Sequence, residues 1–424
     1  MKYDKRKEAS NLPKLIFLID AKSRVTTYDI EKIGVQYFVD KGYLCEIWSI
    51  HTKGEADYQY TSKNYSGELM FEFGRRQYKR QTKKNRNSIF FVYNVLEAKD
   101  IYVLAKNKCK YIFYGDLGLV RWISLPNTNT FKKKWLNIYD KNGLFKTCVL
   151  GGKTLFYNLY KLINKRINIL LTPKVYLPLF IVSSTKENDK LYPAYMNGCK
   201  ELYIHSTDYD RYVEEERKGS VYKGKYILWI DSGWGFIGAQ SIIKSYLSQD
   251  NLDMYNNRET YFAELRYLFE KMEVYYRMPV IIAGHPHTVY DRDMYDNREF
   301  HFGKTAELVK NAEFVMMNIS TSLSFTLLWN KKILMVCDDA FARTISWREW
   351  GIPTCEMLGL RPLNWNKKEM REEPWKYVQT VDPVKRKAYL DAYVDSNMPQ
   401  TKNRLIVEIV EEELQKICNE REIQ

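Results

Sequence analysis

The chain has 424 residues, of which 45% are hydrophobic, 28% charged and 15% aromatic. This balance excludes a wholly disordered chain, and 20 Gly with 12 Pro exclude collagen-like and low-complexity sequences. The 66 Lys and Arg exceed the 52 Asp and Glu, giving a net charge of +14. Such a surplus favours an anionic partner, which could be nucleic acid, an anionic membrane face or a phosphorylated substrate.

Short apolar runs alternate with amphipathic stretches, a pattern typical of an α/β protein with parallel sheets. In the first half this pattern predicts strands over 14–20, 44–50, 88–93 and 111–114. It also predicts a helix over 28–41 and a helical stretch after residue 93 that ends at 106. In the middle it predicts two strands within 167–184, a strand over 202–205 and a helix over 209–218.

The turn-rich segment 219–225 has no apolar period and marks a domain boundary. Beyond it we predict strands over 226–231, 279–283, 314–318 and 332–336. We predict helices over 239–247, 258–276, 305–311, 320–329 and 405–417. The sequence thus divides into domains 1–218 and 219–400, followed by a C-terminal helix in 401–424.

The sequence favours a cytoplasmic protein. The early charges are followed only by the short apolar run Leu15–Ile19, which is not typical of an export signal. The most apolar stretch, 167–182, contains Lys174 and two prolines, whereas a membrane span needs ~20 mostly apolar residues. Seven scattered cysteines without a CxxC pair fit a reducing compartment.

A dense basic segment, Arg75–Arg86, contains seven cations within twelve positions. Two interpretations stay open. It is either a solvated loop or a docking segment for anionic lipid, which would make the protein peripheral on the inner membrane.

The predicted strand 226–231 ends in Asp231, and Ser232-Gly233-Trp234-Gly235 follows before a predicted helix. Glycines at such a turn let the backbone approach a phosphate, and the helix N-terminus supplies unpaired N–H donors. A dinucleotide-binding fold, another phosphate-facing turn and a purely structural turn are the alternatives.

A second motif, His285-Pro286-His287, follows the predicted strand 279–283. Ligands of open α/β sheets bind at such strand ends, where a histidine can donate to a phosphate or act as an acid on a leaving group. The alternatives are a surface turn or an HxH zinc site, for which further ligand candidates are Asp291, Asp293 and His301.

A third motif, Gly303-Lys304-Thr305, resembles the end of a phosphate-binding P-loop, but Arg298 stands where the earlier glycine belongs. What remains is a helix start at which Lys304 and Thr305 could meet phosphate and Glu307 could accept from ribose hydroxyls. An ordinary capped helix start is the alternative.

A fourth motif, Ser320-Thr321-Ser322, lies between a predicted strand and a predicted helix. Hydroxyls and N–H groups there can hold a phosphate, and an ordinary N-cap is the alternative. The DxD triplets at 208–210 and 291–293 are interpreted as structural or solvated.

Residues 226–336 resemble bacterial surface-polysaccharide glycosyltransferases of the GT-B type. The matching features are the glycine turn after Asp231, the His285-Pro286 motif, the segment Gly303 to Val309 and the helix start at Ser320-Thr321-Ser322. The similarity is to the sialyltransferase-like members that build capsule or lipopolysaccharide from CMP-activated acidic sugars. It implies an α/β fold with two Rossmann-like domains facing a cleft.

The resemblance also implies roles for residues. His285 would contact or protonate the donor phosphate, and Ser320, Thr321 and Ser322 would hold it. An acidic motif supplies the base in that family; here Asp231 is followed by Ser232, so Asp20 and Asp116 are alternative bases. The further donor-binding candidates are Gly233, Gly235, Pro286, Gly303, Lys304, Thr305 and Glu307.

The prediction is therefore a metal-independent glycosyltransferase without a cofactor, in which domain 219–400 binds a nucleotide sugar. Domain 1–218 would bind a glycan acceptor, which could be lipid-linked, and the C-terminal helix would pack back toward it. Alternatives are a UDP, GDP or dTDP sugar as donor, an epimerase or phosphotransferase of the same fold, and a nucleic-acid-binding protein. No recognised nucleic-acid-binding motif is present, so nucleic acid is not the expected partner.

Overall fold

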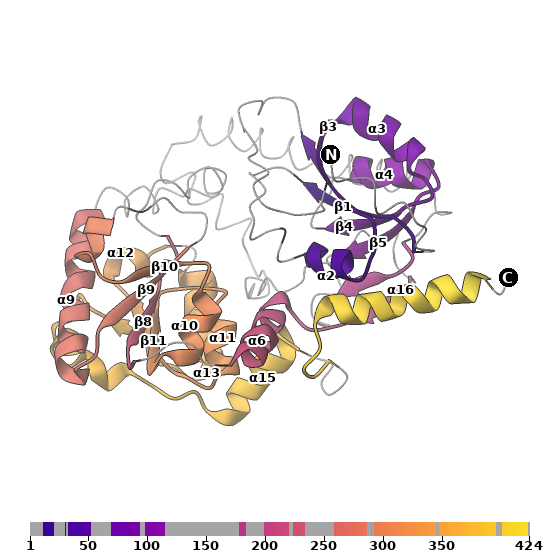
Figure 1. The fold of residues 1–424 in the computed structure, drawn as a ribbon. Coiled ribbons are helices and arrows are strands. Elements are labelled where there is room, and N and C mark those ends of the chain that lie inside the picture. The colour runs from indigo at the N-terminus through magenta and orange to yellow at the C-terminus, as the bar shows by residue number, and fades with distance from the viewer. Residues whose placement is uncertain are drawn as a thin grey trace, which may run out of the picture. The chain divides into compact units, whose positions relative to one another are not determined.

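The computed structural model describes residues 12–20, 30, 33–51, 69–93, 98–114, 178–183, 199–219, 224–233, 258–285, 290, 292–344, 347–395 and 401–422. The chain forms two compact units, one from most of residues 1–202 and the other from most of residues 203–424. Each unit is built on its own β-sheet (Figure 1).

The sheet of the first unit has the strand order β3-β2-β1-β4-β5-β6-β7, and its pairings from β3 to β6 are parallel. The first strand is central and the chain winds outward from it in both directions, which is a Rossmann-like order. Its strands are β1 (Leu15–Asp20), β2 (Cys45–His51), β3 (Leu69–Gly74), β4 (Ile89–Tyr93), β5 (Lys110–Tyr114), β6 (Ile181–Ser183) and β7 (Glu201–Tyr203).

Helices cover both faces of this sheet, so the central strands are apolar without alternation. On one face, Phe17 and Phe91 stack with ring centroids 4.7 Å apart beneath Phe38. On the other, Phe90 and Tyr78 belong to a second buried cluster. The described helices are α2 (Val35–Asp40), α3 (Arg75–Lys84) and α4 (Ala98–Lys106).

The sheet of the second unit has the order β10-β9-β8-β11-β12-β13, and all its pairings are parallel. Its first strand is again central, so this unit is also Rossmann-like. The strands are β8 (Ile227–Ile230), β9 (Val280–Gly284), β10 (Phe300–Phe302), β11 (Phe314–Met317), β12 (Lys332–Cys337) and β13 (Leu363–Asn364).

Helices surround this second sheet, and most of its strand residues are fully buried. The longer helices are α6 (Thr207–Lys218), α9 (Arg258–Tyr276), α15 (Pro383–Tyr393) and α16 (Ile406–Glu422). The shorter ones are α10 (Thr305–Asn311), α11 (Leu323–Leu328), α12 (Asp339–Ala342), α13 (Ile352–Leu358) and α14 (Lys368–Glu372). Single turns are η4 (Arg292–Tyr295), η5 (Trp347–Gly351) and η6 (Pro374–Tyr377).

The predicted fold class is confirmed: the protein is α/β, with two Rossmann-like units. Their arrangement across a cleft remains a prediction. None of the described helices has the length and hydropathy that a bilayer crossing requires.

Contacts place α6 with the second unit, whereas the predicted boundary followed it at 218/219. The Nζ of Lys310 in α10 donates to the carbonyl of Glu215 at 2.6 Å, and Trp329 packs against Tyr212. The first turn of α16 is held by α6, because Ile406 N donates to Asp210 Oδ1 at 2.9 Å. Packing of the rest of α16 against the first domain remains a prediction.

Two elements differ from their predicted form. The helix predicted over 28–41 includes α2, which begins only at Val35, since Gly34 adopts a left-handed φ of 67°. The basic segment, for which a solvated loop was one interpretation, is helix α3. The predicted helix 239–247 lies outside the described residues.

Candidate functional site

Three adjacent strands of the second unit, β9, β8 and β11, end at the same edge of the sheet. Chain order reverses between β8 and β11, and ligands of open α/β sheets bind at that reversal, outside the carboxyl ends of the strands. Neighbouring strands lie about 4.8 Å apart, so the ends of β9 and β11 are separated by about 10 Å. Three predicted motifs follow these strands, and the fold therefore brings them together.

Asp231 directly follows β8 and is only 3% exposed. Its Oδ2 accepts a hydrogen bond from the backbone N of Gly233 at 2.8 Å and another from the hydroxyl of Tyr290. Burial raises the pKa of this carboxyl above its usual value, and these two hydrogen bonds oppose the rise. Asp231 is thus an internal anchor of the turn after β8.

Tyr290 connects Asp231 to the end of β9. While its hydroxyl donates to Asp231, it accepts from the backbone N of His285 at 2.7 Å. The Tyr290 ring packs on Phe300 and Phe302 of β10. One phenol therefore fixes where the histidine leaves the strand, and the His285 residue itself is half-buried.

The residue before His285 has to be glycine. A Cβ on Gly284 would lie 2.3 Å from the ring of Phe300, closer than real Cβ contacts allow. The ring thus lies against the end of β9 and lets the strand end immediately before the histidine.

The turn after β8 is also tied to the end of β11. Ser232 Oγ donates to the carbonyl of Ile319. Gly233 has a left-handed φ of 76°, which favours glycine. Asn318 is buried at the end of β11, where its Nδ2 donates to the carbonyl of Val336 at 2.9 Å. The strand ends of β8, β11 and β12 are therefore joined by side-chain hydrogen bonds.

The Ser320-Thr321-Ser322 motif forms the turn between β11 and α11, and all three residues are half-buried. Ser322 N donates to Ser320 Oγ at 3.2 Å, while the side chain of Ser322 makes no capping bond to α11. This turn lies two strands from His285, on the same sheet edge. The structure thus places these hydroxyls at the strand reversal.

The third motif lies farther out, at the end of edge strand β10. Gly303 has a left-handed φ of 69°, and Lys304 precedes the first turn of α10, which begins at Thr305. The exposed Lys304 lies 4.0 Å from Glu307. These residues share the sheet edge with Asp231 and are two strands away from β8.

Other predicted site residues are not placed. Gly235, Pro286 and the alternative base Asp116 lie outside the described residues. Asp20 ends β1 in the first unit, and its side chain is likewise outside the description.

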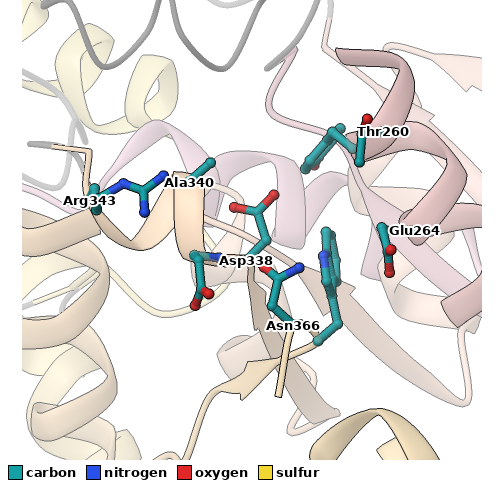
Figure 2. Close-up of a pocket in the computed structure, with 9 residues that line it drawn as sticks. Thr260, Glu264, Asp338, Ala340, Arg343 and Asn366 are labelled. Carbon is teal, nitrogen blue, oxygen red and sulfur yellow. Dashed lines mark hydrogen bonds between the residues drawn. The ribbon is translucent and has the colours of Figure 1, made fainter. Parts of the chain in front are cut away.

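A pocket of about 360 Å³ opens beside the same sheet edge, next to β12. In Figure 2, Asp338 and Asn366 lie at the centre of the view, with Arg343 to one side and Glu264 to the other. Two further lining side chains are aromatic. The lining residues are Thr260, Tyr261, Glu264, Asp338, Asp339, Ala340, Arg343, Trp365 and Asn366.

The carboxylates of this pocket are held by short contacts. Asp339 Oδ1 accepts from Asn364 Nδ2 at 2.8 Å, and its backbone N donates to Asn366 Oδ1 at 2.7 Å. Asp338 accepts from the backbone N of Phe341, and burial raises the pKa of its carboxyl. The pocket lining contains three acidic residues, Glu264, Asp338 and Asp339, and one basic residue, Arg343.

Tyr261 connects the pocket with the strand ends. Its hydroxyl donates to Asn318 Oδ1 at 3.1 Å. Burial raises its pKa well above the ordinary value, and the charges of Asp231 and Asp338 raise it further. The phenol thus lies close enough to both carboxyls to respond to each, and the pocket belongs to the same region as the three motifs.

Sequence reasoning missed Tyr290 and the pocket. Tyr290 lies 59 positions from Asp231 and belongs to no motif. Asp338 and Asp339 directly follow β12, which was predicted over 332–336, so the rule that drew attention to Asp231 and His285 could have found them as well.

Within the described ranges, no three His, Cys, Asp or Glu side chains gather as ligands of a metal would. The zinc alternative involves His287 and Asp291, which lie outside those ranges. Metal independence stays a prediction.

No protein-family model matches the chain, and no curated protein matches it either. Among solved structures, a variant of the wall teichoic acid polymerase TagF soaked with CDPG is 11% identical, with a TM-score of 0.49 over 98% of this chain and 92% of that one. MurG of Acinetobacter baumannii is 8% identical, with a TM-score of 0.44 over 90% and 96%.

The UDP-GlcNAc 2-epimerase of Methanocaldococcus jannaschii is 11% identical, with a TM-score of 0.43 over 87% of this chain and 93% of that one. These proteins include a polymerase and an epimerase, so the likeness by itself selects no activity for this chain.

Proposed function

We propose that the protein is a glycosyltransferase of the GT-B type, with its two Rossmann-like domains facing a cleft. The second unit would bind a nucleotide sugar, and the first unit would bind a glycan acceptor. The acceptor hydroxyl would attack the anomeric carbon, the bond from that carbon to the phosphate oxygen would break, and the nucleotide would leave.

One observation carries this proposal. His285, Asp231 and the Ser320-Thr321-Ser322 turn follow three neighbouring parallel strands at the reversal of strand order. A sugar nucleotide needs one group for its phosphate and another for its leaving oxygen. The ends of β9 and β11 are roughly 10 Å apart, so a phosphate between them could be approached by side chains from both strand ends.

We assign the phosphate to the hydroxyls of Ser320, Thr321 and Ser322, and the departing oxygen to the imidazole of His285. A histidine donates to an oxyanion near neutral pH, and hydroxyls add hydrogen bonds to the charged phosphate. Gly233, Gly235 and Pro286 would shape the approach to the phosphate. Lys304, Thr305 and Glu307 are proposed as outer donor contacts.

Asp231 has two candidate roles. As a base it would take the proton of the acceptor hydroxyl, with Asp20 as the alternative. Its burial and its hydrogen bonds to Gly233 and Tyr290 favour a positioning role instead, in which it holds Tyr290 against His285.

Two lines of reasoning favour different donors. The sequence resemblance favours a CMP-activated acidic sugar, such as a sialic acid or Kdo type. The pocket beside β12 favours a hydroxyl-rich group, because the carboxyls of Asp338 and Asp339 can accept from hydroxyls and outnumber the one lining cation, Arg343. A UDP, GDP or dTDP sugar is therefore kept as the alternative.

We expect the acceptor to be a bacterial surface glycan, such as a capsule or lipopolysaccharide precursor. A lipid-linked acceptor would bring a cytoplasmic enzyme to the inner face of the inner membrane.

The test of this function is His285→Ala, with His301→Ala as the matched control. His301 belongs to the same unit, but it lies on edge strand β10 and bonds to Glu299 at 2.7 Å. We expect His285→Ala to lower kcat by 10²–10⁴, which is about the contribution of one general acid, with an unchanged melting temperature. The control should keep its activity, and near-normal turnover of His285→Ala would end the assignment.

A further inference from the structure

Helix α3 of the first unit presents a row of cations on one side. Arg76, Lys79, Arg80, Lys83 and Lys84 follow the spacing i, i+3, i+4, i+7 and i+8, which places them on one helix face. All five are exposed.

The opposite side of α3 is fixed to the core. Tyr78 and Thr82 are each fully buried, and Tyr78 belongs to the cluster beneath the helix. Thr82 Oγ1 bonds to the carbonyl of Tyr78 at 2.7 Å. Because this side cannot turn outward without unfolding the helix, the cations are held toward solvent.

The positive surface continues beyond the helix. Arg86 follows α3, and Lys106, Lys108 and Lys110 surround the turn between α4 and β5. This turn lies against the end of α3, since Cys109 Sγ donates to the carbonyl of Thr82 at 3.7 Å. Figure 1 shows α3 and α4 side by side, and the two helices are in contact. We call these nine residues the basic face: Arg76, Lys79, Arg80, Lys83, Lys84, Arg86, Lys106, Lys108 and Lys110.

In the described residues, no side chain of the basic face forms an ion pair. Glu46 lies near the start of β2, at the sheet edge where Lys110 begins β5. It is already paired with Lys14 at 2.5 Å and accepts from Trp48. In the second unit several exposed cations do meet carboxylates, as Lys387 meets Asp391 and Lys376 meets Glu373. Among the described residues of its own unit, no carboxylate therefore neutralises the positive charge of the basic face.

The charge of the whole chain is divided in the same way. Residues 1–202 contain 36 Lys and Arg against 18 Asp and Glu, a net charge of +18. Residues 203–424 contain 30 Lys and Arg against 34 Asp and Glu, a net charge of −4. The attraction to anions belongs to the first unit.

We propose that the basic face docks the first unit on a bilayer that contains anionic lipids. A membrane is a broad surface, so one whole face of a helix can meet its headgroups at once, and each Lys or Arg near the surface adds to binding. Single-stranded nucleic acid binds instead through exposed aromatic rings together with cations. The one aromatic residue of α3, Tyr78, is fully buried.

The docking is electrostatic and does not insert the helix, because α3 contains a single large apolar side chain, Tyr78, and that side chain is buried. It should therefore depend on salt, since the Debye length falls from about 10 Å at 0.1 M to about 3 Å at 1 M.

The experiment is co-sedimentation of the full chain with vesicles of phosphatidylcholine, with and without about one part in three of phosphatidylglycerol. We expect binding only to the anionic vesicles, and release at high salt. The triple variant Lys79→Gln, Arg80→Gln, Lys83→Gln should bind about 100-fold more weakly, because each lost charge costs about fivefold.

A matched control removes three exposed cations from the second unit: Lys368→Gln, Lys376→Gln and Lys387→Gln. It changes the net charge equally and should bind as the wild type does. Unchanged melting temperatures of both variants would show that neither is unfolded.

Equal binding of the wild type and the α3 variant would overturn the proposal, and so would absence of binding to anionic vesicles. Retention on single-stranded RNA in place of vesicles would assign the basic face to nucleic acid and also overturn it. Docking does not depend on the donor site, so the α3 variant should keep any rise in melting temperature that a nucleotide causes. If no nucleotide raises the melting temperature of the wild type, that result counts against the glycosyltransferase function and not against the docking.

Discussion

At the scale of single residues, the candidate site depends on a buried carboxyl. Asp231 lies at the end of a fully buried strand, where an unpaired charge would be very unfavourable. Hydrogen bonds from Tyr290 and Gly233 stabilise its charged form. The hydroxyl of Tyr290 also accepts from the backbone N of His285, so the same side chain holds both residues. Asp231 and His285 could be predicted because each follows an apolar run. Tyr290 could not, because its contact depends on the packing of its ring against β10.

The pH dependence of stability tests the burial of Asp231. Burial raises the pKa of this carboxyl in the folded chain. Its contribution to the free energy of unfolding is therefore fully present below the ordinary pKa of 3.8 and is lost as pH rises through the folded-state pKa. In Asp231→Asn this titration is absent. The free energy of unfolding of the wild type minus that of Asp231→Asn should fall as pH rises above 3.8.

Urea unfolding at several pH values measures this difference, and Asp391→Asn on the exposed face of α15 is the control. A difference that increases with pH would mean that the hydrogen bonds from Tyr290 and Gly233 outweigh burial.

At the scale of elements, the inner strands were predictable because parallel strands covered on both faces are continuous apolar runs, whereas the edge strands β3, β10 and β13 were not predicted. Helix α9 was predicted with its observed bounds, Arg258–Tyr276, because its buried positions follow the helical period. Helix α3 was not predicted, because only Tyr78 and Thr82 contact the core and the remaining positions are polar. The length of α2 depends on the backbone of Gly34, which the apolar pattern does not reveal.

The attachment of α16 to α6 can be tested at Asp210. Its Oδ1 lies 2.5 Å from His205 Nε2 and accepts from Ile406 N at 2.9 Å. In Asp210→Ala the buried imidazole and the first amide of α16 lose their partner, which should cost about 1–3 kcal/mol of stability. Hydrogen exchange of the amides in α16 should accelerate, and urea unfolding gives the free energy.

Glu214→Ala is the matched control in the same helix, since Glu214 pairs with Arg211 one turn away. It should change stability by less than about 0.5 kcal/mol. Unaltered exchange in α16 of Asp210→Ala would contradict the attachment.

At the scale of the whole molecule, two sheets of the same Rossmann-like order carry different charge. The second unit has the strand-end motifs, the acidic pocket and a slight negative charge, whereas the first unit has the basic face and most of the positive charge. This division suits a donor site on one unit and a membrane-associated acceptor on the other. The apolar pattern predicted the inner strands of both sheets, but the pocket joins residues from α9 to Asn366 and could not be predicted from any local motif.

The central claim is that the strand ends of the second unit bind the phosphate of a nucleotide. Thermal unfolding with CMP, CDP, UDP, GDP and dTDP tests this claim on the wild type and on Thr321→Val. The control is Thr326→Val, because the hydroxyl of Thr326 in α11 is fully buried and cannot reach a ligand. At least one nucleotide should raise the melting temperature of the wild type and the control, with about 2.7 kcal/mol of stabilisation at 100 times Kd. The same nucleotide should bind Thr321→Val about tenfold more weakly, because one hydrogen bond to a charged group is lost. A response to CMP alone would favour the acidic-sugar donor, whereas no response to any nucleotide, or an equal response in Thr321→Val, would contradict the claim.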